Sequence, residues 1–370
     1  MCLTATRLTA CPYPPLMTSI VPGNPPHLRP AMVIHGPEVF DHGDAAWLLE
    51  CLSPSRTLVA GVMARTAAEE SGLPLAFDGR PPSLVIRDTE GPVFLANRGK
   101  TPYSGRVFGD IVASRLGSRG LVQVECSAAR IWCWDKGDAA LATDLAARTG
   151  FAFEKAASTP ASPLPTRQIR GCMPGEPVYV NGIIIGRATA GVVVLRNGRE
   201  GIEVVSGLLP KAHGLEKLRR AGSIDIGSSW CKSGAVRSVA ARGGIRAGRY
   251  GRILVIDHCG HEMYARMGED CCGVLAVGDD TTAVCGHICL HRGIPVLGIT
   301  DNDADTILPS SFAPGSLILD TRPGRDDDAG AEIAKTIPEG KVCWDDWVQE
   351  VLDRFSSRFT VALDLREGSP

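Results

Sequence analysis

The stretch that decides the fold is Gly273-Val274-Leu275-Ala276-Val277-Gly278-Asp279-Asp280-Thr281-Thr282, followed by a helix-like segment and by Gly293-Ile294-Pro295-Val296-Leu297-Gly298-Ile299-Thr300-Asp301-Asn302-Asp303-Ala304-Asp305. Each of its two apolar runs is short and ends in an acidic loop. Such runs are typical of parallel strands that are buried on both faces. Because open α/β sheets bind ligands beyond the carboxyl ends of their strands, the stretch predicts five aspartates at a ligand-binding edge.

The same alternation of short strands and helices occurs near the start of the chain, and a β-rich part lies between the two. We therefore expect an α/β fold with two Rossmann-like α/β domains flanking a small antiparallel β module. The expected segments are a disordered extension (1–31), a Rossmann-like domain (32–155), a β-rich module with a basic connector (168–250) and a Rossmannoid domain with acidic loops (251–370).

Local patterns give more specific expectations. The apolar run Ser83-Leu84-Val85-Ile86 predicts a strand, and residues 281–292 predict a helix. Two Asn-Gly pairs, Asn181-Gly182 and Asn197-Gly198, lie between apolar runs and predict hairpin turns. A segment of small residues and prolines, 156–167, predicts a linker.

Composition limits the classes of protein to which the chain can belong. The formal net charge is −2, which disfavours nucleic acid as a partner. No apolar run approaches the length of a membrane span, so we expect no membrane partner. The 13 cysteines are an odd number in a chain of 370 residues, which indicates a reducing, cytoplasmic environment instead of a disulfide scaffold. Association between copies of the chain stays open.

The acidic loops predict a combined phosphate and metal site. Asp301, Asp303 and Asp305 alternate, so their carboxylates can converge on one Mg²⁺. Asp279, Asp280, Thr281 and Thr282 begin a helix, where Asp280 or Thr281 is expected as the cap and backbone amides favour a phosphate. The alternative is that these residues only cap helices and form turns.

Histidines and cysteines cluster near the acidic loops. His258, His287 and His291 form a candidate ligand set for zinc or iron. His261 and Glu262 form a candidate acid–base pair. The alternative for the cysteines of the same helix is that they are small core residues.

Two further groups carry polar side chains. In the first domain, His35 and Glu38 follow the first strand, and Arg65 and Thr66 follow the second, where a ligand phosphate or carboxylate can bind; no dinucleotide fingerprint is present. The connector carries a basic run that includes Lys211, Lys217 and Lys232. A basic connector opposite an acidic metal loop suits a phosphorylated ligand, and a solvated surface is the alternative.

The last part of the chain resembles the Toprim-type and pyrophosphokinase-like Rossmannoid domains, in which an Asp-x-Asp motif follows a strand. In a Toprim domain an acidic residue after the first strand joins this motif to bind Mg²⁺, and Asp257 or Glu262 corresponds to it here. The stretches 34–41, 59–66 and 277–305 carry a second resemblance. Through them the chain from Met32 onward is similar to an uncharacterised family known mainly from methanogenic archaea.

These observations lead to three hypotheses. The first is a Mg²⁺-dependent enzyme or binder of a phosphorylated or nucleotide-like small molecule. The second is a non-catalytic protein that senses or assembles a metal or cofactor of methanogenic metabolism through its Cys/His cluster. The third is a Toprim-like nucleic-acid enzyme, against which the near-neutral charge argues.

Overall fold

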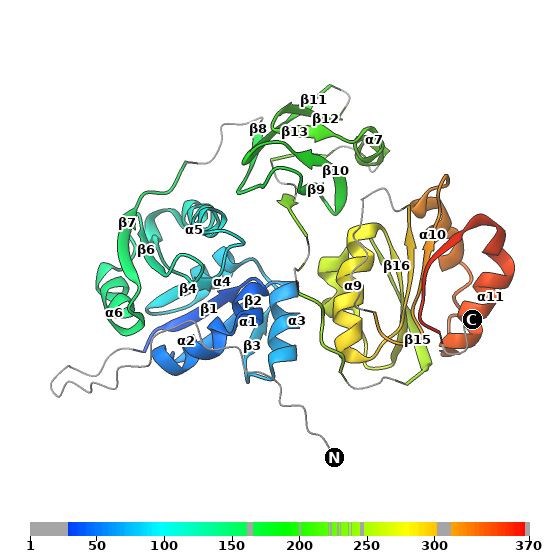
Figure 1. Ribbon diagram of the computed structural model, residues 1–370, viewed down its shortest axis with the longest axis horizontal. Helices are drawn as coiled ribbons and strands as arrows, with labels where there is room; N and C mark the ends of the chain where they lie inside the picture. Colours follow the sequence, from blue (N-terminus) through cyan, green and yellow to red (C-terminus); the bar gives the residue numbers. More distant parts are fainter. Residues whose placement is uncertain are drawn as a thin grey trace, which may run out of the picture.

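The computed structural model describes residues 29–160, 166–199, 201–301 and 312–366, except positions 221, 223, 228, 230, 236, 238 and 245–247. It is a mixed α/β chain with both parallel and antiparallel sheets. Figure 1 shows one sheet with its helices in blue and cyan, a β-rich module in green, and a second large sheet in yellow and red. Residues 1–28 of the expected extension and 161–165 of the expected linker lie outside the described residues.

The first large sheet has the strand order β3-β2-β1-β4-β5-β6-β7. Strands β1 to β5 are parallel to one another, and β6 is antiparallel to β5. The strands are β1 (Ala31–His35), β2 (Arg56–Ala60), β3 (Ala76–Asp78), β4 (Val93–Asn97), β5 (Leu121–Glu125), β6 (Arg130–Trp134) and β7 (Ala152–Ala156). The helices are α1 (Glu38–Asp41), α2 (Asp44–Leu52), α3 (Val62–Ser71), α4 (Pro82–Asp88), α5 (Pro102–Leu116) and α6 (Ala139–Thr149).

The strand predicted at 83–86 is wrong, because these residues belong to helix α4. Pro82 lies in the first turn of this helix, where its missing amide hydrogen costs nothing. Val85 and Ile86 face the core, whereas Leu84 is exposed, which is a helical and not an alternating pattern. A four-residue apolar run is too short to distinguish the two structures.

The β-rich module consists of two small antiparallel sheets with the orders β13-β10-β9-β14 and β12-β11-β8. Its elements are β8 (Thr166–Arg170), β9 (Pro177–Val180), β10 (Ile183–Ala188), β11 (Val192–Gly198), β12 (Gly201–Ser206), β13 (Leu208–Pro210), α7 (Ala212–Arg220) and β14 (Cys231–Ser233). Asn181 and Gly182 both have positive φ, at 48° and 83°, so the first predicted hairpin turn is confirmed. The second is shifted: Asn197 and Gly198 pair within the ladder, and the chain turns after them.

The second large sheet has the order β19-β15-β16-β17-β18-β20. Its four central strands are parallel, and the two edge strands are antiparallel to their neighbours. The strands are β15 (Tyr250–Asp257), β16 (Cys271–Val277), β17 (Val296–Thr300), β18 (Leu317–Asp320), β19 (Val342–Cys343) and β20 (Thr360–Asp364). The helices are α8 (Met263–Arg266), α9 (Asp279–Arg292), α10 (Asp326–Ala334) and α11 (Trp344–Phe355).

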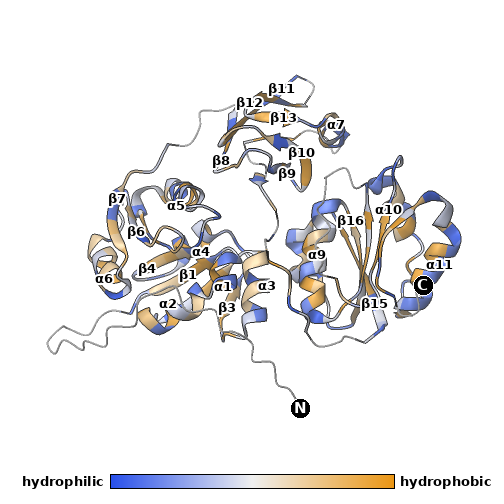
Figure 2. Cartoon of the chain, viewed as in Figure 1, coloured by the Kyte–Doolittle hydropathy of each residue, from blue (hydrophilic) through white to orange (hydrophobic). Residues whose placement is uncertain are grey.

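Helices cover both faces of this sheet, so three of its parallel strands are fully buried. Every residue of β16, β17 and β18 is buried. Figure 2 shows these strands in orange between helices whose outer faces are blue. Within the described residues, no helix has the length and apolar character that crossing a membrane requires.

Ion pairs connect helices of the first large sheet to later parts of the chain. Arg292 of α9 donates to both carboxylate oxygens of Glu69 on α3, at 2.9 Å each. Arg237 is a buried connector residue, and it donates to Asp41 of α1 and to Glu70 of α3. The Arg237 contacts anchor the connector to α1 and α3.

Candidate functional site

The carboxyl ends of the parallel strands of the second large sheet form an acidic edge. Asp257 ends β15, Asp279 and Asp280 follow β16, Asp301 follows β17, and Asp320 ends β18. Because adjacent parallel strands end at the same side of a sheet, their acidic groups converge there. Asp320 is covered by Arg322, whose guanidinium donates to its carboxylate at 2.6 Å.

The β-rich module lies over the acidic edge and forms a cleft with it. One wall is the start of β10 together with α7, and the other wall is the strand ends. The lining residues are Gly182, Ile183, Ile184, Gly214, Lys217, His258, Asp279, Asp280, Asp301 and Asp326. The free volume of about 20 Å³ accommodates one water molecule or one cation.

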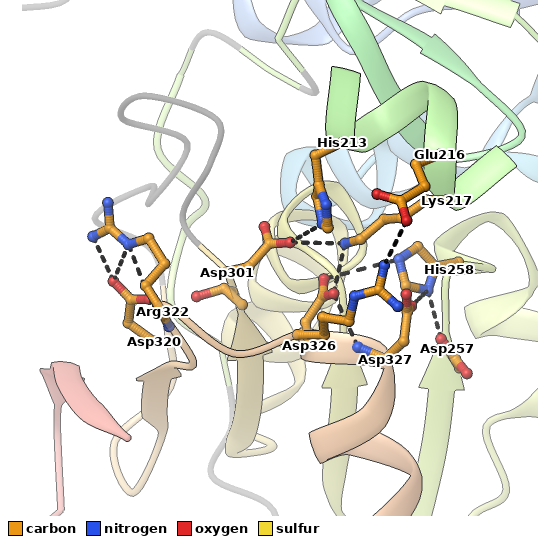
Figure 3. A network of polar contacts seen from close by, with 12 residues as sticks. His213, Glu216, Lys217, Asp257, His258, Asp301, Asp320, Arg322, Asp326 and Asp327 are labelled. Atoms are coloured by element: carbon orange, nitrogen blue, oxygen red, sulfur yellow. Dashed lines mark hydrogen bonds and ion pairs between the residues drawn. The ribbon is translucent and has the colours of Figure 1, made fainter. Parts of the chain in front are cut away.

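Lys217 of α7 lines this cleft. Its ammonium donates to Asp301 Oδ2 at 2.8 Å and to Asp326 Oδ1 at 2.5 Å. His213, one helical turn earlier, has its Nε2 3.3 Å from the same oxygen of Asp301. Figure 3 shows these side chains of α7 directed at the two aspartates. Burial disfavours the ammonium form of Lys217, but the charge of Asp326 and the two hydrogen bonds outweigh it and raise the pKa of the lysine.

The imidazole of His258 also lines the cleft. Its Nδ1 is 2.5 Å from Asp257 Oδ1 and 3.6 Å from Asp327 Oδ1, and its Nε2 is 4.0 Å from Asp326. Burial lowers the pKa of His258, but the Asp257 hydrogen bond and the neighbouring carboxylates raise it overall. In the described part of the chain, one group of three residues has donor atoms close enough to hold a metal ion: Asp257, His258 and Asp327, within 4.8 Å of one another.

The first turn of α9 supplies backbone amides on the other side of the cleft. Its N-cap is Gly278, and no side chain caps it in the described part of the chain, so the expected capping by Asp280 or Thr281 is wrong. Asp280 instead accepts from Lys232 of β14, at 3.0 Å. Thr282 is buried and faces β17, where a Cβ on Gly298 would lie 2.5 Å from its methyl group.

Two of the predicted site residues, His261 and Glu262, lie outside the lining of the cleft. They form a short 3-10 helix with Gly260 after β15. The His261 side chain is 67% exposed, and Glu262 accepts from Arg266 at 2.5 Å. The histidines that the structure places beside the aspartates are His213 and His258.

His287 and His291 lie on α9 away from the cleft. Burial, with a smaller contribution from the charge of Arg237, lowers the pKa of His287 to about 4. The charge of Asp41 acts in the opposite sense, so His287 lies near the ion pair between Arg237 and α1. Cys285 and Cys289 are fully buried among apolar side chains of the sheet, and burial raises the pKa of both thiols. This environment agrees with their alternative interpretation as core residues.

The predicted ligand-binding residues of the first domain have structural partners. His35 Nδ1 is 2.9 Å from the carbonyl oxygen of Ala60, and its ring stacks on Phe108. Arg65 lies over the ring of Tyr264 at 3.9 Å, and the Thr66 hydroxyl is 3.0 Å from the Tyr264 hydroxyl. Arg65 and Thr66 thus join α3 to Tyr264 of α8.

Glu38 is half-buried at the start of α1. Burial, opposed in part by a backbone hydrogen bond and by the charge of Lys100, raises the pKa of its carboxyl group. It belongs to α1, whereas the cleft is formed by the module and the second large sheet. The structure therefore does not bring Glu38 together with the acidic edge.

Comparison with known proteins places the chain in a family. A family described as an uncharacterized protein conserved in archaea matches residues 32–341. The chain belongs to this family. It is also 28% identical, over 357 residues, to an uncharacterized protein of Methanocaldococcus jannaschii, covering 89% of this chain and 97% of that protein. No solved structure matches the chain. The expected archaeal family is thus confirmed, and the Toprim resemblance stays a sequence-based expectation.

Of the three aspartates predicted to bind Mg²⁺, the structure describes one. Asp301 lines the cleft, whereas Asp303 and Asp305 lie outside the described residues. Asp326 is not among the residues predicted from sequence; it begins α10 in a run of three aspartates. A run of acids at a helix start is an ordinary feature, so the signal that could have found it is weak.

Proposed function

We propose that this protein binds a phosphorylated, nucleotide-like small molecule together with Mg²⁺ in the cleft between the β-rich module and the acidic edge. The observation that carries the proposal is the convergence of Asp279, Asp280, Asp301 and Asp326 on one cleft that basic side chains close from the opposite side. Carboxylates suit the cation, and lysines with helix amides suit the phosphate.

The donor set fits Mg²⁺. This cation is usually held by one or two carboxylates, and phosphate oxygens and water complete its octahedral shell. Asp301 and Asp326 offer oxygens to one common point, because both contact the same ammonium group. Asp303 and Asp305 follow directly in the sequence, and they remain part of the proposed ligand set.

The charge of the cleft explains why a cation is needed. A helix N-terminus attracts phosphate through its amides. At the start of α9, Gly278 brings the backbone close to His258, because an added Cβ would lie 2.9 Å from the imidazole Nε2. However, Asp279 and Asp280 in the same turn repel a phosphate. A divalent cation between the carboxylates and the ligand removes this repulsion, so we expect anion binding to depend on Mg²⁺.

The proposal is tested by calorimetric titration of the full chain with ATP and with inorganic pyrophosphate, each with Mg²⁺ and with EDTA. We expect binding only with Mg²⁺. Asp280→Asn and Asp301→Asn are each expected to weaken it at least about tenfold, which corresponds to about 1.4 kcal/mol. Phosphate release in the same samples distinguishes an enzyme from a binder.

The matched control is Asp346→Asn, because Asp346 is exposed on α11. It should bind like the wild-type protein. Binding of equal strength in EDTA, or unchanged binding by both site variants, would refute the proposal.

A second candidate function rests on the grouping of His258 with Asp257 and Asp327. An imidazole with two carboxylates suits a transition metal, so a metal-sensing or assembly role remains a proposal. Metal analysis after anaerobic purification tests it, with His258→Ala compared with a His287→Ala, His291→Ala double variant. Stoichiometric zinc or iron that either variant loses supports this role, and metal-free wild-type protein excludes it.

A further inference from the structure

Lys217 is the ion-pair partner of both Asp301 and Asp326. Only 8% of its side chain is exposed, and the Asp301 and Asp326 side chains are 6% and 1% exposed. A buried ammonium is stable only where carboxylates compensate its lost hydration. The lysine is therefore held by the same oxygens that the proposed function assigns to Mg²⁺.

The lysine and the aspartates come from different parts of the fold. Lys217 belongs to α7 of the β-rich module, and the aspartates follow β17 and begin α10 of the second large sheet. Gly214 brings α7 close to β10, because a Cβ there would lie 1.8 Å from the carbonyl oxygen of Ile184. The ammonium thus reaches the acidic edge from a helix that is firmly joined to its own module.

An ammonium and a divalent cation cannot both occupy the point between Asp301 and Asp326. Mg²⁺ requires oxygens at about 2.1 Å, and a positive ammonium at hydrogen-bond distance from the same oxygens would repel it.

We infer that Lys217 acts as a tethered counter-ion, which holds the cation position in the free protein, yields it to the divalent cation, and then contacts the ligand phosphate. This inference rests on the proposed function. The lysine competes with the cation when no phosphate is present, and it has an anionic partner when phosphate is present. Cation and phosphorylated ligand must therefore bind with positive coupling, each increasing the affinity for the other.

The test compares Mn²⁺ binding to wild type, Lys217→Met and Lys217→Arg, first alone and then with inorganic pyrophosphate. We expect Lys217→Met to bind Mn²⁺ alone about tenfold more tightly than wild type, because the competing charge is gone. With saturating Mn²⁺, the same variant should bind pyrophosphate about tenfold more weakly. Lys217→Arg keeps the charge and should keep the weak Mn²⁺ binding of wild type.

A folded Lys217→Met variant with unchanged or weaker Mn²⁺ affinity would overturn the inference, even if wild type binds pyrophosphate. Tighter Mn²⁺ binding by the variant, with no pyrophosphate binding by either protein, would support the competition and refute the proposed function. If the variant does not fold, the displacement of Lys217 is tested by measuring amide hydrogen exchange of the wild-type protein with and without Mn²⁺. Mn²⁺ alone should speed exchange in α7, and unchanged exchange with bound Mn²⁺ contradicts displacement.

Discussion

The backbone of Gly182 lies directly against the carbonyl group of His258: a Cβ added to Gly182 would be 2.7 Å from that oxygen. Gly182 belongs to the β9–β10 turn of the module, and His258 follows β15 at the acidic edge. The close approach means that the absence of a side chain at one turn position determines how near the module comes to the cleft.

Gly182→Ala should therefore destabilise the protein more than a comparable substitution elsewhere in the module. Gly175→Ala is the matched control, because Gly175 also has positive φ but has no atom within 4 Å of its added Cβ. We expect about 1 kcal/mol of destabilisation from the left-handed backbone at both positions, and a further loss at Gly182 from the contact. Urea unfolding measures the difference, and equal losses would mean that the module does not rest on His258.

Arg237 neutralises two buried carboxylates, Asp41 and Glu70, whose side chains are 6% and 2% exposed. Arg237→Met leaves both acids without their cation, and we expect a loss of about 3–5 kcal/mol in the free energy of unfolding. Arg130→Met is the control, since its pair with Glu154 is about half exposed and should cost less than about 1 kcal/mol. Similar losses for the two variants would show that the Arg237 ion pairs are not needed to hold the connector.

Acid should destabilise the protein through His287. Its folded-state pKa is about 4, below the ordinary value of 6.5, so between these pH values the unfolded chain binds a proton that the folded chain rejects. Stability therefore falls as the pH decreases through this window, by up to about 3 kcal/mol from this group. His287→Met should show a smaller loss over this range, measured by urea unfolding.

His261→Gln is the control for this acid effect, because His261 is exposed at the surface. It should retain the full pH dependence of the wild-type protein. If His287→Met also retains it, burial of His287 does not cause the acid sensitivity.

The acidic edge could be anticipated because its causes are local. Apolar runs that end in Asp279 and Asp301 indicate buried parallel strands, and parallel strands bring their ends together. The Asn181-Gly182 turn could also be predicted from sequence, since both residues tolerate the positive φ that such a hairpin requires. These features depend on short-range sequence patterns alone.

The contacts that complete the cleft could not be predicted in this way. Lys217 pairs with Asp301 and Asp326 across 84 and 109 positions of sequence. The basic connector indicated cations near the acidic loops, but its pattern did not distinguish a buried lysine from solvated ones. The path of the chain after β15 places His258 beside the aspartates and leaves His261 exposed. The residue types alone do not determine this path.

The central claim is that Asp301 and Asp326 hold a divalent cation beside the start of α9. The most direct measurement is the anomalous diffraction of crystals of the full chain grown with Mn²⁺ and inorganic pyrophosphate. We predict a manganese peak about 2.1 Å from oxygens of both aspartates, with pyrophosphate between the ion and α9 and with Lys217 displaced. A map in which Lys217 still bridges Asp301 and Asp326 and manganese is absent from the cleft would contradict the account.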